Sequence, residues 1–108
     1  MSNSAYEFTQ STTITSSTAE TTIGTAVTGV NLKLKSLSVV NTSASQTEVT
    51  IRDGTAGNTV QVFGVPATDM RGWIPPGGYL QPTVSRNWTA QCADSVASII
   101  VTATFEYA

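Results

Sequence analysis

The sequence predicts an all-β fold: an antiparallel β-sandwich of the jelly-roll kind, with an extended N-terminal arm. Apolar and polar residues alternate along short segments, and turn residues recur roughly every eight to twelve positions. No segment has the period of an amphipathic helix. Because the chain has 108 residues, we expect one sandwich domain over residues 25–108, preceded by an arm over residues 1–24.

The composition predicts a neutral polar surface. Only 11% of the residues are charged, the net charge is −2, and histidine is absent. Binding of nucleic acid needs clustered basic residues, and Lys33 and Lys35 form the sole close basic pair, so we expect no nucleic-acid partner. Strand faces rich in Thr, Ser, Asn and Gln suit contact with other protein surfaces.

The predicted arm is rich in Ser and Thr, and its large apolar residues are Tyr6, Phe8, Ile14 and Ile23. These are too few to form a core of their own. One alternative is a flexible tail. The other is an arm whose β-prone threonines pair with a sheet edge of the same subunit or of a neighbouring one. On the second alternative the four apolar side chains are candidate interface residues.

The segment "GVNLKLKSLSVVN" predicts a strand that contains a β-bulge. Leu32 and Leu34 alternate with polar residues, whereas Leu37 and Val39 fall on the opposite parity. The chain must therefore change phase near Lys35, which a bulge accomplishes. Bulges bend strands, so the pattern favours a curved sandwich over a flat sheet.

The segment "EVTIRDGTAGNTVQVFG" predicts a β-hairpin. A register that sets Ile51 opposite Val60, and Val49 opposite Val62, gathers apolar side chains on one face. The intervening "GTAG" is then a loop. We expect this face to be buried and the other to be wet.

The last two strands are predicted within "TVSRNWTAQC" and "VASIIVTATFEYA". Pairing them as a hairpin sets Ala90 against Ile99 and Trp88 against Val101. The same alternation places Phe105 on the inward face. We therefore expect the C-terminal strand to be part of a sheet.

The segment "TDMRGWIPPGGYLQP" has no clear period, and its "PPGG" must form a turn. Trp73 and Tyr79 flank this turn. They could plug one end of the core, anchor a subunit interface, or form a platform on which sugars stack. We favour the core plug first and the interface second, because the loop lacks the acid and amide cluster of a sugar site.

No pattern indicates catalysis, a cofactor or a metal site. Histidine is absent and the carboxylates are scattered, so we expect no enzyme. Asp53 and Asn58 could offer oxygen atoms to calcium, but a hairpin tip that bonds its own backbone is favoured. Cys92 is the only cysteine, which excludes an intrachain disulfide, and we expect a small core residue.

No long apolar run is present, and the N-terminal "MSNSAYEFTQ" lacks the pattern of a signal peptide. We therefore expect no membrane association and a protein made in the cytoplasm.

The order of these features resembles that of the small all-β virion proteins of tailed bacteriophages. The likeness covers roughly Leu34 to the C-terminus, and "SVVNTSASQTEVTIRDG", "GWIPPGGYL" and the final strand with its aromatic end carry it. The resemblance implies a homo-oligomer, often a trimer, that decorates or cements a capsid or forms part of a tail or head fibre. It implies no catalytic residue.

Our first hypothesis is a capsid decoration protein that binds the major capsid protein on the head of a tailed phage virion. A tail or head-fibre component is the alternative within the structural class. From another class, a carbohydrate-binding module would use Trp73, Tyr79 and Trp88.

Overall fold

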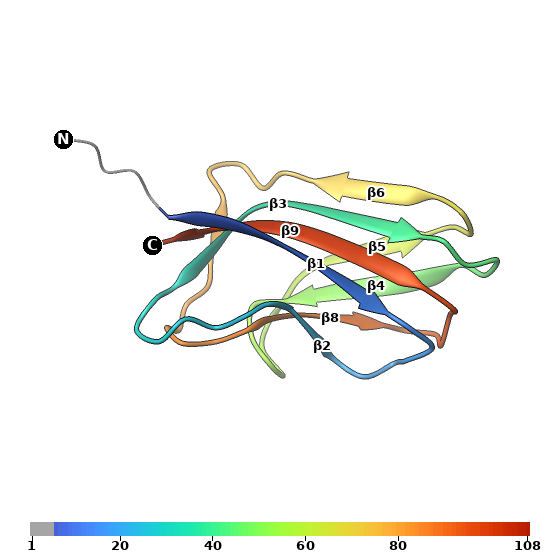
Figure 1. Cartoon of the computed structure of the whole chain (residues 1–108), viewed down its shortest axis with the longest axis horizontal. Coiled ribbons are helices and arrows are strands. Elements are labelled where there is room, and N and C mark those ends of the chain that lie inside the picture. The colour runs from blue at the N-terminus through green and yellow to red at the C-terminus, as the bar shows by residue number, and fades with distance from the viewer. Residues whose placement is uncertain (1–5) are drawn as a thin grey trace.

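The computed structural model describes residues 6–108 and places their strands in two antiparallel sheets that pack face to face (Figure 1). Sheet A has the order β1 (Glu7–Ile14), β9 (Ile99–Tyr107), β3 (Leu32–Asn41) and β6 (Met70–Trp73), and the short β7 (Tyr79–Leu80) also pairs with β3. Sheet B has the order β2 (Thr21–Gly24), β8 (Trp88–Cys92), β4 (Thr47–Arg52) and β5 (Thr59–Val65).

The connections identify the sandwich as a jelly roll. The chain passes from one sheet to the other between β1 and β2, β2 and β3, β3 and β4, β5 and β6, β7 and β8, and β8 and β9. As a result β9 lies between β1 and β3, while β8 lies between β2 and β4. Interleaving of the two halves of the chain in both sheets is the Greek-key pattern of jelly rolls. The predicted fold class is confirmed.

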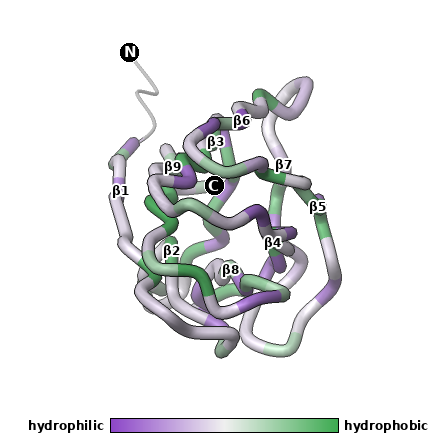
Figure 2. The backbone as a smooth tube through the Cα atoms, turned by 90° about the vertical axis from the view of Figure 1, so that its right-hand side faces the viewer, coloured by the Kyte–Doolittle hydropathy of each residue, from purple (hydrophilic) through white to green (hydrophobic). Residues whose placement is uncertain are grey.

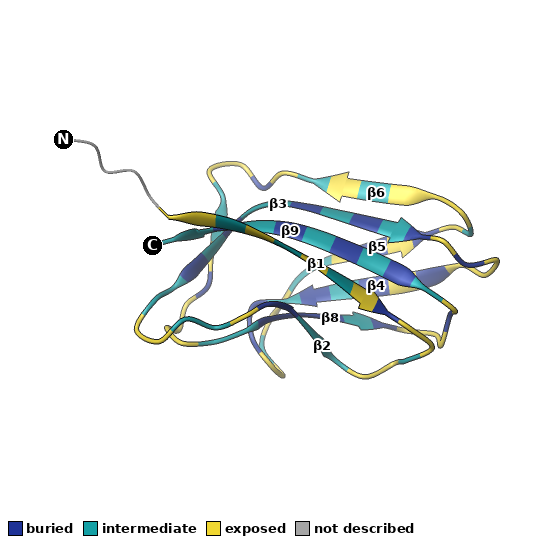
Figure 3. Cartoon of the chain, viewed as in Figure 1, coloured by how far each residue is buried: buried dark blue, intermediate teal, exposed yellow. Residues whose placement is uncertain are grey.

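The core lies between the two sheets. Buried and partly buried residues alternate along β3 and β9 in Figure 3, as expected for strands with one inward face. Val39 and Val101 of sheet A are completely buried, as are Val49, Ile51 and Trp88 of sheet B. Figure 2 shows hydrophobic stretches on the strands of both sheets.

The predicted bulge in β3 is present. Leu34 pairs with Phe105 and Ser36 pairs with Thr104, so Lys35 is the extra residue. Leu32, Leu34, Leu37 and Val39 are all buried as a result. The parity of the apolar residues predicted this feature correctly because each of them must reach the same core.

The predicted register of the β4–β5 hairpin is wrong. Val49 pairs with Phe63 and Ile51 pairs with Gln61, while Arg52 pairs with Thr59. The strand β5 thus contains a bulge at Val60. A shift of one residue exchanges the two faces of a strand, so Phe63 is buried and Val62 is 44% exposed. The larger aromatic surface of Phe63 occupies the core in place of Val62.

The predicted pairing of the last two strands is also wrong. β8 pairs with β2 and β4 in sheet B, whereas β9 pairs with β1 and β3 in sheet A. The inward faces were predicted correctly, since Trp88, Ala90, Ile99 and Val101 are fully buried. Alternation determines which side of a strand faces the core, and it leaves open which strand lies beside it.

The described part of the predicted arm belongs to the sandwich of its own chain. β1 pairs with β9 along its whole length, and β2 pairs with β8. Ile14 is 2% exposed and Ile23 is fully buried. The predicted boundary between an arm over residues 1–24 and a domain over residues 25–108 therefore does not separate two units of the described chain. Residues 1–5 of the predicted arm lie outside the described residues.

Candidate docking surface

The outer face of sheet A carries rows of short polar and apolar side chains across its strands. We call this surface the hydroxyl face. Its residues are Thr9, Ser11 and Thr13 of β1, Ile100, Thr102 and Thr104 of β9, Ser36, Ser38 and Val40 of β3, and Met70 and Gly72 of β6, with Ile74 just beyond. Strand pairing aligns Ser11, Thr102, Ser38 and Gly72 in one row.

Hydroxyl groups on this face bond to one another across the strands. Thr9 Oγ1 lies 2.8 Å from Thr104 Oγ1, and Ser11 Oγ lies 2.9 Å from Thr102 Oγ1. Burying a polar group is costly mainly when it loses its partners. These hydroxyl groups keep a partner when water leaves, so covering the face costs little desolvation free energy.

Two ion pairs lie near the two ends of sheet A. At one end Lys33 Nζ lies 3.6 Å from Glu106 Oε1. At the other end Arg71 Nη1 lies 3.0 Å from Asp69 Oδ2. The Met70 N–H donates to Asp69 Oδ1, and this bond, followed by the Arg71 guanidinium, lowers the pKa of the Asp69 carboxyl. The Lys33–Glu106 pair thus lies at one end of the hydroxyl face, whereas Arg71 pairs with the inward-facing Val39 and lies on the opposite side of β6.

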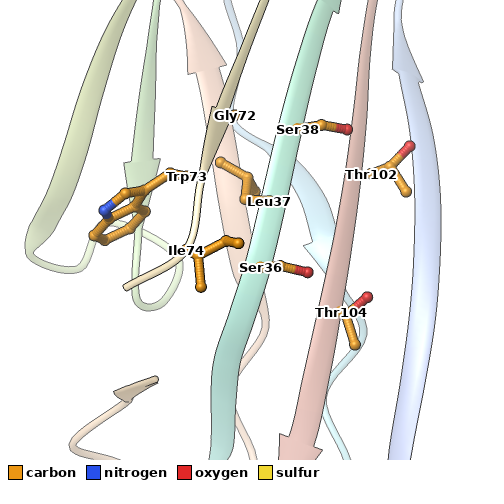
Figure 4. A pocket seen from close by; sticks show the side chains of 8 residues that line it. All are labelled: Ser36, Leu37, Ser38, Gly72, Trp73, Ile74, Thr102 and Thr104. Atoms are coloured by element: carbon orange, nitrogen blue, oxygen red, sulfur yellow. The ribbon is translucent and has the colours of Figure 1, made fainter. Parts of the chain in front are cut away.

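A shallow hollow of about 550 Å³ lies over Gly72 on this face. A Cβ atom on Gly72 would meet only the Leu37 carbonyl oxygen, at 3.9 Å, so the glycine leaves space above the sheet. Figure 4 shows the hydroxyls of Ser36, Ser38, Thr102 and Thr104 on the neighbouring strands, with the Trp73 ring turned away from them. Ile74, which is 76% exposed, lines the hollow.

The four predicted interface residues of the N-terminal arm occupy different environments. Tyr6 is 74% exposed, and its ring centroid lies 5.3 Å from that of Tyr107. The Phe8 ring is partly buried and lies 5.4 Å from the ring of Phe105. Ile14 and Ile23 are buried in the core of their own chain, so in this structure neither is accessible to a neighbouring subunit.

The structure does not bring Trp73 and Tyr79 together. The Trp73 ring packs edge-on against Phe63, with centroids 6.3 Å apart, and the Tyr79 ring packs edge-on against Trp88 at 5.6 Å. Both rings therefore lie against the core. Trp88 is fully buried, so it offers no ring face on which a sugar could stack.

The tip of the β4–β5 hairpin bonds its own backbone. Asp53 Oδ1 accepts a hydrogen bond of 3.0 Å from the Asn58 N–H, and the Asp53 N–H donates to the Asn58 carbonyl. Among residues 6–108, no group of His, Cys, Asp or Glu side chains is arranged to hold a metal ion. Nor does this described part contain a helix long and apolar enough to cross a membrane.

The hydroxyl face was not predicted as a unit from the sequence. Its signal was present in the outward positions of "EFTQSTTI" and "IIVTATFEY", where Thr and Ser alternate with inward residues. The pairing of β1 with β9 was needed to see that these positions form one surface.

Comparison with known protein families finds no matching family model, and no curated protein sequence matches the chain. Solved structures do match. The subunit of Bacillus endospore appendages, described as disulfide-linked pili, superposes with a TM-score of 0.61 at 10% identity, covering 95% of this chain and 87% of that one. The coat protein of Tobacco streak virus gives a TM-score of 0.54 at 9% identity, covering 98% and 88%. These likenesses support the same conclusion as the strand order: the chain has a jelly-roll fold.

Proposed function

We propose that this chain is a structural protein of a virion, specifically a capsid decoration (cement) protein of a tailed bacteriophage. It binds the major capsid protein on the outer surface of the head and stabilises the head. It acts as a homo-oligomer, with a trimer as the expected form, and performs no catalysis. The observation that carries the proposal is the uncharged hydroxyl face of sheet A.

The hydroxyl face has the properties of a surface that is exposed before assembly and covered afterwards. Its paired hydroxyls keep it compatible with water, and the exposed side chains of Met70 and Ile74 add apolar area. Interface centres are depleted in charged residues. A subunit that must dock at many identical sites gains from such a face, because no ion has to be desolvated at each site.

The structural likenesses are compatible with this role. One similar structure is a virus coat protein and another is the subunit of disulfide-linked pili. The single cysteine of this chain, Cys92, is 1% exposed, so its thiol is not available at the surface for a linkage of the kind named for the pili. This burial favours the virion alternative for this chain.

The location is tested by electron microscopy of purified virions. Density for this jelly roll over the whole head lattice is the expected result. Density on the tail or at the head vertices alone would favour the tail or head-fibre component. Absence of this protein from the particle would overturn the proposal.

The docking face is tested by a pair of substitutions that each add one positive charge. Ser38→Arg places the charge on the hydroxyl face, and Thr83→Arg places it in an exposed loop. We expect Ser38→Arg to lower co-sedimentation with particles that lack the native protein by at least about tenfold, because the new charge must be desolvated. Thr83→Arg should bind normally. Equal binding of the two folded variants would exclude this face.

A further inference from the structure

The two sides of the sandwich differ in how their sheet edges are protected. On one side the edges of β1 and β2 are linked: Thr12 Oγ1 donates to the Thr22 carbonyl, and Gln10 Oε1 accepts from the Thr25 N–H. On the other side β6 ends sheet A and β5 ends sheet B. The strand β6 is short and carries the Asp69–Arg71 ion pair at its start. The strand β5 is longer and contains neither a charged residue nor a proline.

Charges, prolines and bulges are the usual protection of a free strand edge. The bulge of β5 lies at Val60, so the segment from Gln61 to Val65 carries none of these features. The Val62 N–H donates to Gln61 Oε1 at 3.0 Å, on the exposed surface. This amide is therefore bonded to the side chain of its own neighbour. An incoming carbonyl oxygen can replace that side-chain oxygen with no net loss of hydrogen bonds.

A hollow of about 510 Å³ lies at the end of sheet B where β5 ends and β4 begins, and its lining includes Glu48, Gly64 and Asp94. Gly64 pairs with Glu48 across the β4–β5 ladder. A Cβ atom on Gly64 would meet nothing within 4 Å, so the space above Gly64 is open, and Gly64 and Glu48 line the same hollow. In the described part of the chain, the ion pairs involve neither Glu48 nor Asp94.

We propose that β5 accepts an extended strand of a partner polypeptide that carries a lysine or arginine. The partner's backbone pairs with the edge between Val62 and Gly64. Its basic side chain lies over Gly64 and reaches Glu48. Neighbouring strands are about 4.8 Å apart, so the added backbone lies about 10 Å from β4. The partner's basic side chain and the Glu48 side chain can span this distance when they extend towards each other.

The basic residues of this chain are bonded within it or lie on strands that have neighbours on both sides, which points to a different polypeptide as the partner. Lys33 and Lys35 lie on β3, which has neighbours on both sides, and Arg52 lies on β4 between β8 and β5. Arg86 donates to the Thr55 carbonyl, and Arg71 is paired with Asp69. A second copy would have to break one of these arrangements to supply the cation. The proposal concerns sheet B and does not depend on the role of the hydroxyl face.

The test uses two short capped peptides, Thr-Val-Thr-Lys-Thr-Val-Thr and the same peptide with Glu in place of Lys. Binding to the full chain is followed by amide chemical shifts and hydrogen exchange. We expect the Lys peptide to bind and to slow exchange of the Val62 amide. We expect the Glu peptide to bind at least about threefold more weakly, because it lacks the exposed ion pair with Glu48 and brings a like charge close to that carboxylate.

Two variants and one control test whether the partner's basic side chain passes over Gly64 to Glu48. Glu48→Gln removes the carboxylate, and Gly64→Val fills the space over the glycine; both should reduce the preference for Lys over Glu. Glu7→Gln, which neutralises an exposed carboxylate on β1, should leave the preference unchanged. Equal binding of the two peptides, shifts centred on β6 instead of β5, or no binding at millimolar peptide would each overturn the proposal.

Discussion

Gly24 lies directly against the aromatic ring of Phe105. A Cβ atom built on Gly24 would come within 2.5 Å of Phe105 Cζ and 2.6 Å of Cε2. Gly24 is the last residue of β2 in sheet B, whereas Phe105 belongs to β9 in sheet A. The close approach of the two sheets at this point therefore depends on the missing side chain.

Gly24→Ala should destabilise the protein by about 2 kcal/mol, because an added methyl group must displace a buried aromatic ring. The measurement is urea unfolding followed by circular dichroism. Gly64→Ala is the matched control, since a Cβ atom there meets nothing within 4 Å. Equal midpoints for the two variants would contradict the close packing at Gly24.

Gln81→Leu should cost about 3 kcal/mol of unfolding free energy, because it leaves several buried backbone groups without partners. The Gln81 side chain is fully buried. Its Oε1 accepts from the Leu32 N–H at 2.7 Å, and its Nε2 donates to the carbonyls of Asp53 and Arg86. Gln46→Leu, at an exposed position, is the control for the change in side-chain polarity. A neutral effect of Gln81→Leu would show that this network adds little to stability.

Cys92 should make the protein less stable at alkaline pH. Burial, and then the nearby Asp94 carboxylate, raises the pKa of the Cys92 thiol above its ordinary value of 9.0. The folded state therefore holds the thiol proton more tightly than the unfolded state. This contribution to stability is complete below the unfolded pKa and is lost as pH rises through the folded pKa.

The measurement is the urea midpoint as a function of pH for the native chain and for Cys92→Ala. We expect the native midpoint to fall more steeply than that of the variant above about pH 9. In the same solutions, thiol reagents should react with native Cys92 far more slowly than with the unfolded chain. Parallel pH profiles would show that Cys92 ionises freely in the folded protein.

A chain that begins at Thr25 should fail to fold. The truncation removes Ile14 and Ile23 from the core and leaves the edge of β9 without its partner β1. The predicted boundary between an arm over residues 1–24 and a domain over residues 25–108 implied a folded product, and the pairing of β1 with β9 reverses that expectation. Circular dichroism and dye binding to exposed apolar surface provide the measurement.

Addition of a peptide spanning residues 6–24 should restore the β signal of the truncated chain, because the peptide supplies the missing partners of β9 and β8 together with the core side chains of Ile14 and Ile23. A scrambled peptide of the same composition is the control. A truncated chain that folds without any added peptide would show that the sandwich does not need residues 1–24.

Features that depend only on which side chains of a strand point into the core could be predicted from the sequence. The bulge at Lys35 followed from the change in parity between Leu34 and Leu37, because both must reach the core. The inward positions of Trp88 and Phe105 followed from the same alternation. Such predictions hold because burial of apolar side chains acts on each strand separately.

Features that depend on which strands lie side by side could not be predicted in the same way. The pairing of β8 with β4 instead of β9 is a choice between partners of equal apolar pattern. The bulge at Val60 left the Asp53–Asn58 bond at the hairpin tip as expected, yet it shifted Ile51 from Val60 to Gln61. The hydroxyl face could not be predicted for the same reason, since it forms only when β1, β9 and β3 pair.

The central position of β9 in sheet A has a consequence for the order of folding. Thr9 and Thr104 face each other although they lie 95 positions apart in the chain. During synthesis, β1 and β3 are made long before the strand that separates them, so sheet A cannot close until β9 has left the ribosome. Such long-range pairing slows folding and leaves unpaired edges exposed in the meantime. Nascent chains that stall before β9 should therefore be the form most prone to aggregate and the form that most needs a chaperone.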